Sequence, residues 1–388
     1  MRVGLLTASF DPVIGGAETY ALNVADGLSS LGHDVLVVTD TPHGVEDVAP
    51  DPIHRPFEVR RLFRYRQRLF DRQKLPWEEM AFSLSAEIKD ALDRSRPDVL
   101  MSNSLDTAFQ ASVIRRAMAL PWVATFHEHA PELEPFGDGR MATVYGDLRP
   151  DAVIAGSEFY AARARRWGPS SAVHLVHHGV PMVVTTVDDR HRWRLRYGLT
   201  DEQRLIVCVG RLKERKGIRE LLAAFSALRP RERNLRLVVA GTVSSASAAY
   251  FDSLRRRRAE LGYEDLVTFD ETVVADQIPF LMAAADIVAQ PSYEEGLGLA
   301  VLEAMAARRP VVTTRVPGIN EIVTRPGLAL QVEAGDVDAL AEALDRLIDD
   351  PALRLRLGRD GHDHVESAFS LEAMAFATAD VLAAAAKA

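Results

Sequence analysis

Residues 287–307, IVAQPSYEEGLGLAVLEAMAA, contain one complete unit of strand, turn and helix. Ile287–Gln290 is a short apolar run, Gly296 and Gly298 lie in the turn, and the apolar run from Leu299 predicts a helix. The same order of short strand and helix recurs along the chain. Such repetition predicts parallel sheets in an α/β fold.

Two acidic residues of this stretch, Glu295 in the turn and Glu303 in the apolar run, are candidate ligand-binding groups. Glu303 lies within the predicted helix, where a carboxylate is unfavourable unless a ligand or a side chain pairs with it. Sugar hydroxyls are natural partners for such a group. The long separation favours contacts with two parts of one extended ligand over an acid/base pair, and two ordinary surface glutamates are the alternative.

The remaining predicted strands fall into two series. The first comprises Val3–Leu6, Asp34–Thr39, Val99–Met101, Val123–Phe126, Ala152–Ala155 and Ala172–Val176. The second comprises Leu205–Val209, Leu235–Ala240, Val267–Phe269, Ile287–Gln290 and Pro310–Thr313. We therefore expect two Rossmann-like, doubly wound domains facing a cleft, residues 1–180 and 181–370, with a linker over Pro181–Asp189. A last helix, 371–388, either packs back on the first domain or lies elsewhere.

Composition restricts the class of protein. The 388 residues carry a formal net charge of −9, which argues against binding to nucleic acid. The one cysteine, Cys208, excludes a disulfide within the chain. The start, MRVGLLTASF, does not resemble a signal peptide, and no window approaches the ~20 apolar residues of a membrane span. These features predict a cytoplasmic protein.

Turns that suit anions follow several predicted strands. Gly15 and Gly16 open the first helix, where free NH groups attract negative charge, although a plain tight turn fits equally well. The G-x-G-x-x-G spacing of a dinucleotide site is absent there, which disfavours a nicotinamide enzyme. In GRLKERKG, residues 210–217, Arg211 and Lys216 can hold a diphosphate. Lys213 and Arg215 of the same turn are expected in solvent, and a wholly solvated basic loop is the alternative.

His127 ends an apolar strand of the first domain. A histidine at the carboxyl end of a strand can hydrogen-bond a sugar or a developing charge. A lone histidine is more often a structural hydrogen-bonding residue, so the residue by itself does not decide between the two.

Three motifs together, GGAE, GRLKERKG and PSYEEGLGLAVLEAMAARRPVV, resemble those of the retaining nucleotide-sugar glycosyltransferases of family four, which have the GT-B fold. The resemblance covers nearly the whole chain in the right order. It implies transfer of a hexosyl-type sugar from a UDP- or GDP-linked donor to a hydroxyl acceptor on a glycan, lipid or small natural product. It also implies no cofactor, no metal, a first domain on the acceptor side and a second that binds the donor.

The resemblance further implies roles for individual residues. Arg211 and Lys216 bind the diphosphate and stabilise the leaving nucleotide, and Glu303 takes the ribose hydroxyls. Glu295 contacts the donor sugar, and His127 lies near the reacting carbon and the acceptor. The further donor contacts that it implies are Gly15, Gly16, Gly210, Gly296, Leu297, Gly298 and Leu299.

The chain departs from the usual family pattern at four places. These are His178–Pro181 for Asn-Gly-Val-Asp, Glu271 for Gly, Leu297 for Phe, and Pro317-Gly318 for Gly-Gly. They leave the donor sugar and base open. A nucleotide-sugar epimerase and an inactive nucleotide-sugar binder remain as alternatives on the same fold.

Two further segments have competing interpretations. Asp336-Val337-Asp338 looks like the metal-binding DXD of other glycosyltransferases, but it precedes a helical pattern, so we expect a helix cap. Arg60–Lys74, RRLFRYRQRLFDRQK, interleaves basic and apolar residues. It could dock on anionic lipid at the inner membrane face or bind an anionic acceptor. A solvated loop and helix with a few buried anchors is the alternative.

Overall fold

The computed structural model describes residues 1–11, 16–41, 55–62, 77–103, 105–128, 137–168, 171–243 and 247–387. The chain divides into two compact units. Unit 1 consists of Met1–Gly179 together with Leu371–Ala388, and unit 2 consists of Val180–Ser370. No helix among the described residues is both long and apolar enough to span a membrane.

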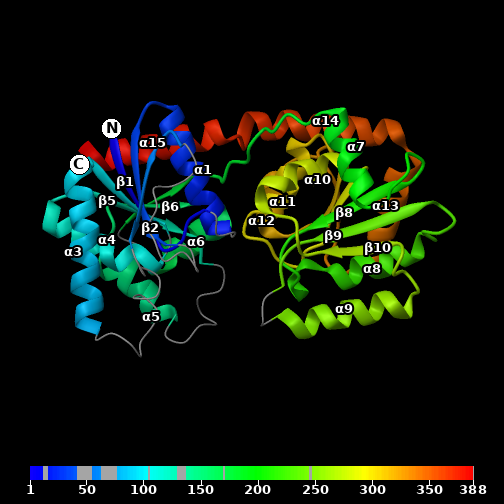
Figure 1. Cartoon of the computed structure of the whole chain (residues 1–388), viewed down its shortest axis with the longest axis horizontal. Helices are drawn as coiled ribbons and strands as arrows, with labels where there is room; N and C mark the ends of the chain where they lie inside the picture. Colours follow the sequence, from blue (N-terminus) through cyan, green and yellow to red (C-terminus); the bar gives the residue numbers. More distant parts are fainter. Residues whose placement is uncertain are drawn as a thin grey trace. The chain divides into compact units, whose positions relative to one another are not determined.

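The strands described in unit 1 form one parallel sheet in the order β3-β2-β1-β4-β5-β6-β7 (Figure 1). They are β1 Arg2–Thr7, β2 Asp34–Asp40, β3 Glu58–Leu62, β4 Val99–Asn103, β5 Trp122–Phe126, β6 Ala152–Ala155 and β7 Ala172–Leu175. The helical segments are α1 Gly16–Ser30, α3 Trp77–Ser95, α4 Leu105–Met118, α5 Gly137–Met141, η2 Ala142–Asp147, α6 Glu158–Trp167 and α15 Leu371–Lys387. The six strands predicted for this unit are confirmed.

Alternation along the strands of unit 1 separates its two apolar layers. In β1, Val3 and Leu5 face a core that includes α1 and α15, whereas Leu6 faces one that includes α3, α4 and α6. Helices α1 and α15 pack closely, because a methyl group added at Gly27 would lie 2.7 Å from the Cβ of Ala375 (Figure 1). The last helix thus belongs to the core of unit 1.

Strand β3 corrects the interpretation of the basic segment. Arg60, Arg61 and Leu62 lie in this edge strand and not in the solvated loop and helix of the alternative. Arg61 donates to the backbone oxygen of Asp11 at 2.6 Å, and Arg60 pairs with Glu58 at 2.8 Å. The sequence Glu-Val-Arg-Arg-Leu lacks the apolar run of the other strands, which is why it was missed. Residues 63–74 lie outside the described residues.

The strands described in unit 2 form a second parallel sheet in the order β10-β9-β8-β11-β12-β13. They are β8 Arg204–Val209, β9 Leu235–Ala240, β10 Val267–Asp270, β11 Ile287–Gln290, β12 Val311–Thr314 and β13 Leu330–Val332. The helical segments are α7 Val187–Arg196, η3 Glu214–Lys216, α8 Ile218–Ala227, α9 Ala248–Glu260, η5 Ala275–Gln277, α10 Ile278–Ala284, α11 Leu299–Ala306, α12 Pro317–Ile322, α13 Val337–Asp349 and α14 Pro351–Ala368. The prediction of two Rossmann-like α/β domains is confirmed.

Unit 2 also differs from the prediction in places. Helix α7 begins inside the expected linker, because Thr186 and Asp189 form a reciprocal capping box. Strand β13 and helix α14 were not predicted, since β13 has only three residues and α14 is largely polar. In β8 the side chains alternate between two cores: Leu205 and Val207 pack with α10 and α11, and Ile206 packs with α8 and α13.

Candidate functional site

Each sheet reverses its strand order at one point, and the candidate residues gather there. In unit 2 the reversal lies between β8 and β11, and parallel sheets bind ligands beyond the carboxyl ends of the strands at such points. The loops that follow these two strands are joined directly, because the NH of Tyr293 donates to the backbone oxygen of Arg215 at 2.8 Å. The sequence motifs around Lys216 and Glu295 therefore meet.

Lys216 and Glu295 form an ion pair at this point. The ammonium Nζ donates to Oε1 of Glu295 at 2.5 Å, and the hydroxyl of Ser292 donates to the same oxygen at 2.7 Å. Both charged side chains are about nine-tenths buried. Burial alone would raise the pKa of Glu295, but the charge and hydrogen bond of Lys216, with help from Ser292 and Arg215, hold it below its usual value. Glu295 is therefore an ionised carboxylate.

Glu303 projects from helix α11 with a different electrostatic balance. Burial raises its pKa to about 7, and the attraction of Lys216 offsets only part of that effect. The unfavourable environment expected for this carboxylate is confirmed. Near neutral pH it is shared between charged and neutral forms, so a small change in surroundings moves its proton.

The other cations of the loop differ in exposure. Arg211 is exposed, and its charge is the main cause that lowers the pKa of the neighbouring Lys213. Lys213 and Arg215, both expected in solvent, are instead partly buried, and the guanidinium of Arg215 donates to the backbone oxygen of Glu294 at 2.9 Å. It also lies 3.7 Å from Oε2 of Glu295. The sequence-based assignment of Lys213 and Arg215 was therefore wrong.

Two glycines shape the turns. Gly210 directly follows β8 and has a φ of 148°, and a methyl group there would lie 3.3 Å from Cε of Lys216. Pro317-Gly318 stands where the family usually has Gly-Gly. A methyl group at Gly318 would lie 2.6 Å from the backbone of Gly296, so packing requires the one glycine that this chain keeps. The predicted donor contacts Gly296, Leu297 and Gly298 are buried in the turn that leads into α11.

Helix α11 begins without a side-chain cap. Gly298 is its N-cap and Leu299 its first residue. The first NH groups of an α-helix have no acceptor within the helix, so they can donate to an anion. This end of α11 directly follows the loop that carries Glu295.

The corresponding reversal in unit 1 lies between β1 and β4, and Asn103 is the last residue of β4. His127 follows β5, the strand that pairs with β4 on its other side, and contacts Asn103. The amide nitrogen of Asn103 donates to Thr7 Oγ1 at 3.2 Å and to the backbone oxygen of Ala17 at 2.9 Å. Its oxygen lies 2.9 Å from Nε2 of His127. Since the amide oxygen must accept, we assign the proton of His127 to Nε2, which leaves a lone pair on Nδ1.

An aromatic cluster surrounds His127. The ring of Tyr20 lies 4.7 Å from that of His127 and 4.5 Å from that of His178, centre to centre. Burial lowers the pKa of His127 to about 4. Burial, and then the charge that His127 would carry, also lower the pKa of His178. Both imidazoles are neutral at pH 7. His178 stands where the family usually has asparagine.

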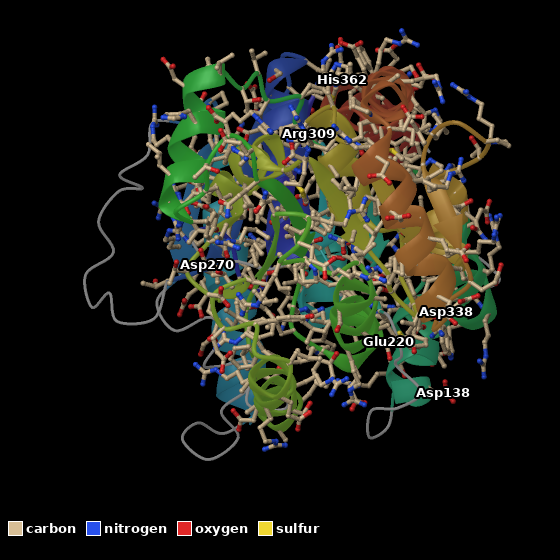
Figure 2. All side chains as sticks on the ribbon, turned by 90° about the vertical axis from the view of Figure 1, so that its right-hand side faces the viewer. Asp138, Glu220, Asp270, Arg309, Asp338 and His362 are labelled. Carbon is tan, nitrogen blue, oxygen red and sulfur yellow. The ribbon has the colours of Figure 1, made fainter. Side chains whose placement is uncertain are left out.

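The remaining predicted site residues take simple positions. Gly16 is the first residue of α1, and a methyl group there would meet no atom within 4 Å. Gly15 lies outside the described residues. Glu271 is exposed in the loop after β10, and Asp270 anchors this loop by accepting from Tyr197 at 2.8 Å and Arg196 at 3.0 Å (Figure 2).

Two acidic groups bear on metal binding. Asp336 accepts from the NH of Ala339 at 2.9 Å and begins α13, so the predicted cap is confirmed; Asp338 is exposed in the first turn (Figure 2). On α14 the side chains of His362, Asp363 and Glu366 lie near one another. Nδ1 of His362 already bonds the backbone oxygen of Ala306, and nothing further in the described structure indicates an ion there.

The sequence did not indicate Asn103, Ser292 or Arg215 as site residues. Asn103 carried the one available signal, since it is a polar residue at the carboxyl end of a buried strand. Ser292 and Arg215 are ordinary surface types within their motifs, and only the joined loops show that they support Glu295.

Two family models match the chain. The model described as Glycosyltransferase Family 4 matches residues 14–183, and the one described as Glycosyl transferases group 1 matches residues 189–364. A GDP-mannose-dependent alpha-(1-6)-phosphatidylinositol monomannoside mannosyltransferase of Mycolicibacterium smegmatis is 32% identical over 264 residues, which cover 66% of this chain and 68% of that protein.

Further similarities extend over nearly the whole chain. A D-inositol 3-phosphate glycosyltransferase of an Arthrobacter species is 28% identical over 91% of this chain and 86% of its own length. Among solved structures, HepE of Anabaena in complex with UDP-glucose superposes with a TM-score of 0.80 at 20% identity, over 99% of this chain and 100% of that one. A sucrose-phosphate synthase of Thermosynechococcus elongatus gives 0.79 at 22% identity, over 98% of each.

Proposed function

The chain belongs to the glycosyltransferases of family four, and we propose that it is a retaining enzyme that moves a hexosyl-type sugar from a nucleotide diphosphate sugar to a hydroxyl acceptor. The observation that carries the proposal is the buried Lys216–Glu295 pair beside the exposed Arg211, at the strand-order reversal of unit 2. We propose that unit 2 binds the donor and unit 1 the acceptor.

The loops of unit 2 supply what a nucleotide diphosphate sugar needs. Arg211 offers a planar fork and Lys216 a compact point charge for the diphosphate. The uncapped start of α11 adds NH groups for the same anion. Glu295 is ionised and would accept from the hydroxyls of the sugar, and Glu303 in its charged form would accept from the ribose hydroxyls.

The proposed donor nucleotide is UDP or GDP. The similar HepE structure holds UDP-glucose, whereas the relative from Mycolicibacterium smegmatis is GDP-mannose-dependent. Glu271 stands in the loop after β10 in place of the usual glycine, so the base pocket of this chain need not follow either relative.

Catalysis would come from positioning and from stabilising the leaving diphosphate, with no nucleophile supplied by the protein. In unit 1 the neutral His127 presents the lone pair of Nδ1, which can accept a hydrogen bond from an acceptor hydroxyl. Arg211 and Lys216 would neutralise the diphosphate, so we propose that transfer needs no divalent metal.

Three further expectations remain proposals. Gly16 is proposed to admit the donor phosphate, and Gly16→Ala probes this cleanly because the added methyl group meets no atom of the protein within 4 Å. Contact of Arg60–Lys74 with a membrane is likewise proposed, and Arg60–Leu62 of this segment belong to β3. The proposed location is the cytoplasm, at the inner face of a membrane if that contact forms.

The test is a screen of UDP- and GDP-linked sugars by thermal shift, followed by transfer assays with a panel of acceptors. Ligand binding raises apparent stability, so the donor should raise Tm. Transfer with retained anomeric configuration, unchanged by EDTA, is the expected result. Tight donor binding without transfer to any acceptor would favour an inactive binder, and interconversion of the donor sugar would favour an epimerase.

A further inference from the structure

We propose that Arg215 is a positioning residue. It holds the carboxylate of Glu295 and its loop in place when Lys216 turns from Glu295 to the diphosphate of the donor. The inference rests on the proposed function, since it needs a donor at Lys216. It assigns a purpose to a cation that the motif alone does not distinguish from its neighbours.

The single ammonium group of Lys216 has two anionic partners, Glu295 and the diphosphate of the proposed donor. In the structure Nζ lies 2.5 Å from Oε1 of Glu295. If the donor is bound as proposed, the same group also faces the diphosphate. Glu295 is about nine-tenths buried, and a buried carboxylate that loses its cation is strongly destabilised. A second partner is therefore needed for as long as the donor is present.

Arg215 is placed to be that partner. Its guanidinium donates to the backbone oxygen of Glu294 at 2.9 Å and lies 3.7 Å from Oε2 of Glu295, the carboxylate oxygen that Lys216 does not bond. Its backbone oxygen accepts from the NH of Tyr293. Arg215 thus contacts the loop after β11 through both backbone and side chain, and a guanidinium can serve two acceptors while it stays protonated.

The other groups near Glu295 cannot take this part. Ser292 donates to Oε1 but carries no charge. Cys208 of β8 is buried, and its pKa is raised to about 12 by burial, so its thiol stays neutral. Glu303 of α11 is itself an acid. The cations that lower the pKa of Glu295 are Lys216 and, more weakly, Arg215.

Arg215→Gln tests the proposal, with Lys213→Gln as the matched control. Both substitutions remove one positive charge from the same loop, but the structure records no bond from the Lys213 side chain to the Glu295 loop. With the donor bound, Glu295 in the Arg215→Gln protein has lost its remaining cation. We expect kcat to fall about tenfold, which is about 1.4 kcal/mol, while KM for the donor changes by less than about threefold.

The pH profiles of kcat and kcat/KM distinguish a positioning role of Arg215 from a purely structural one. The profile of kcat reports groups in the substrate complex, and that of kcat/KM reports the free enzyme. In Arg215→Gln the limb of kcat that belongs to Glu295, which lies at lower pH than that of Glu303, should move up by about half to one pH unit, because Lys216 is then occupied by the donor. The limb of kcat/KM should move less, because Lys216 still pairs with Glu295 in the free enzyme. Lys213→Gln should move neither limb.

Arg215→Lys provides the second variant. It keeps a positive charge near Glu295 but cannot reproduce the fork, so the acid limb of kcat should stay near that of the wild type while kcat recovers only in part. If Arg215→Gln does not accumulate as folded protein, this variant carries the test. If the acid limb of kcat shifts in Arg215→Lys, which retains the positive charge, the proposal is overturned.

The two levels of inference fail differently. If the wild-type protein transfers sugar and Arg215→Gln behaves like Lys213→Gln, or instead weakens donor binding with kcat unchanged, Arg215 is not a positioning residue. If the wild-type protein binds no nucleotide diphosphate sugar at all, the proposed function fails and this inference fails with it.

Discussion

The loops beyond the two sheets occupy equivalent places in the fold and carry opposite chemistry. In unit 1, Asn103 and His127 are neutral groups, and His127 donates a hydrogen bond to Asn103. In unit 2, Lys216 and Glu295 are ionised, and Glu303 titrates near neutral pH. The two sites thus differ in charge. This difference supports the proposed division between a hydroxyl acceptor in unit 1 and a diphosphate donor in unit 2.

Removing the positive charge of Lys216 should have the largest effect on the contrast between the two units. Lys216→Met takes away both the proposed diphosphate ligand and the partner of Glu295. Donor affinity should fall about 100-fold or more, because truncating one member of a buried charge pair costs about 2–5 kcal/mol. Calorimetry with the nucleoside diphosphate measures this, and Lys213→Gln should lose far less. Unchanged nucleotide affinity in Lys216→Met would sink the diphosphate assignment.

A substitution in the neutral region should leave donor binding intact. His127→Ala should lower kcat about 10- to 100-fold, the loss of one or two hydrogen bonds at the reacting centre, with donor affinity within about twofold of wild type. Steady-state rates and calorimetry together separate the two effects. A weaker donor Kd without a change in kcat would place His127 on the donor side and remove the contrast between the units.

The third prediction concerns Glu303, where binding and stability should move in opposite directions. Its pKa is raised from 4.5 to about 7, so the folded protein holds a proton that the unfolded chain has released. Stability therefore falls as the pH rises from about 4.5 to 7. In Glu303→Gln this loss is absent. The free energy of unfolding should exceed that of wild type by about 2–3 kcal/mol at pH 8, a gain that closes toward pH 4.5.

The same substitution should lower donor affinity about tenfold, since an amide replaces a carboxylate at the proposed ribose contact. Urea unfolding at pH 8 and pH 5 and calorimetry at pH 8 measure the two effects. Glu366→Gln, which removes an exposed carboxylate, is the matched control. Equal stability of Glu303→Gln and wild type at pH 8 would contradict the electrostatic picture.

The smallest effect is expected away from both regions. Asp336→Ala removes the N-cap of α13 and should cost about 1 kcal/mol of stability. Its rate of transfer and its response to EDTA should equal those of wild type. A large loss of activity that added magnesium or manganese reverses would show that Asp336 and Asp338 bind a metal after all.

The sequence predicted the sheets well because most strands are short, largely apolar runs that are buried over nearly their whole length, as in β8 and β11. It failed where a strand is half-buried and charged, as in β3. Within the site, spacing indicated Lys216, Glu295 and Glu303. It could not separate Arg215 from Lys213, since both lie on one turn and only the neighbouring loop distinguishes them. The tautomer of His127 depends on Asn103, which is distant in sequence.

Helix α15 has a consequence for how the protein is made. Met374 and Leu382 of this helix belong to the core of unit 1, yet all of unit 2 precedes them in the chain. A ribosome adding about 5–20 residues per second needs roughly 10–40 s to synthesise unit 2. Through that interval the nascent unit 1 exposes the apolar surface that α15 will cover. Early chaperone contact, and loss of unit 1 upon premature termination, are the expected marks of this chain order.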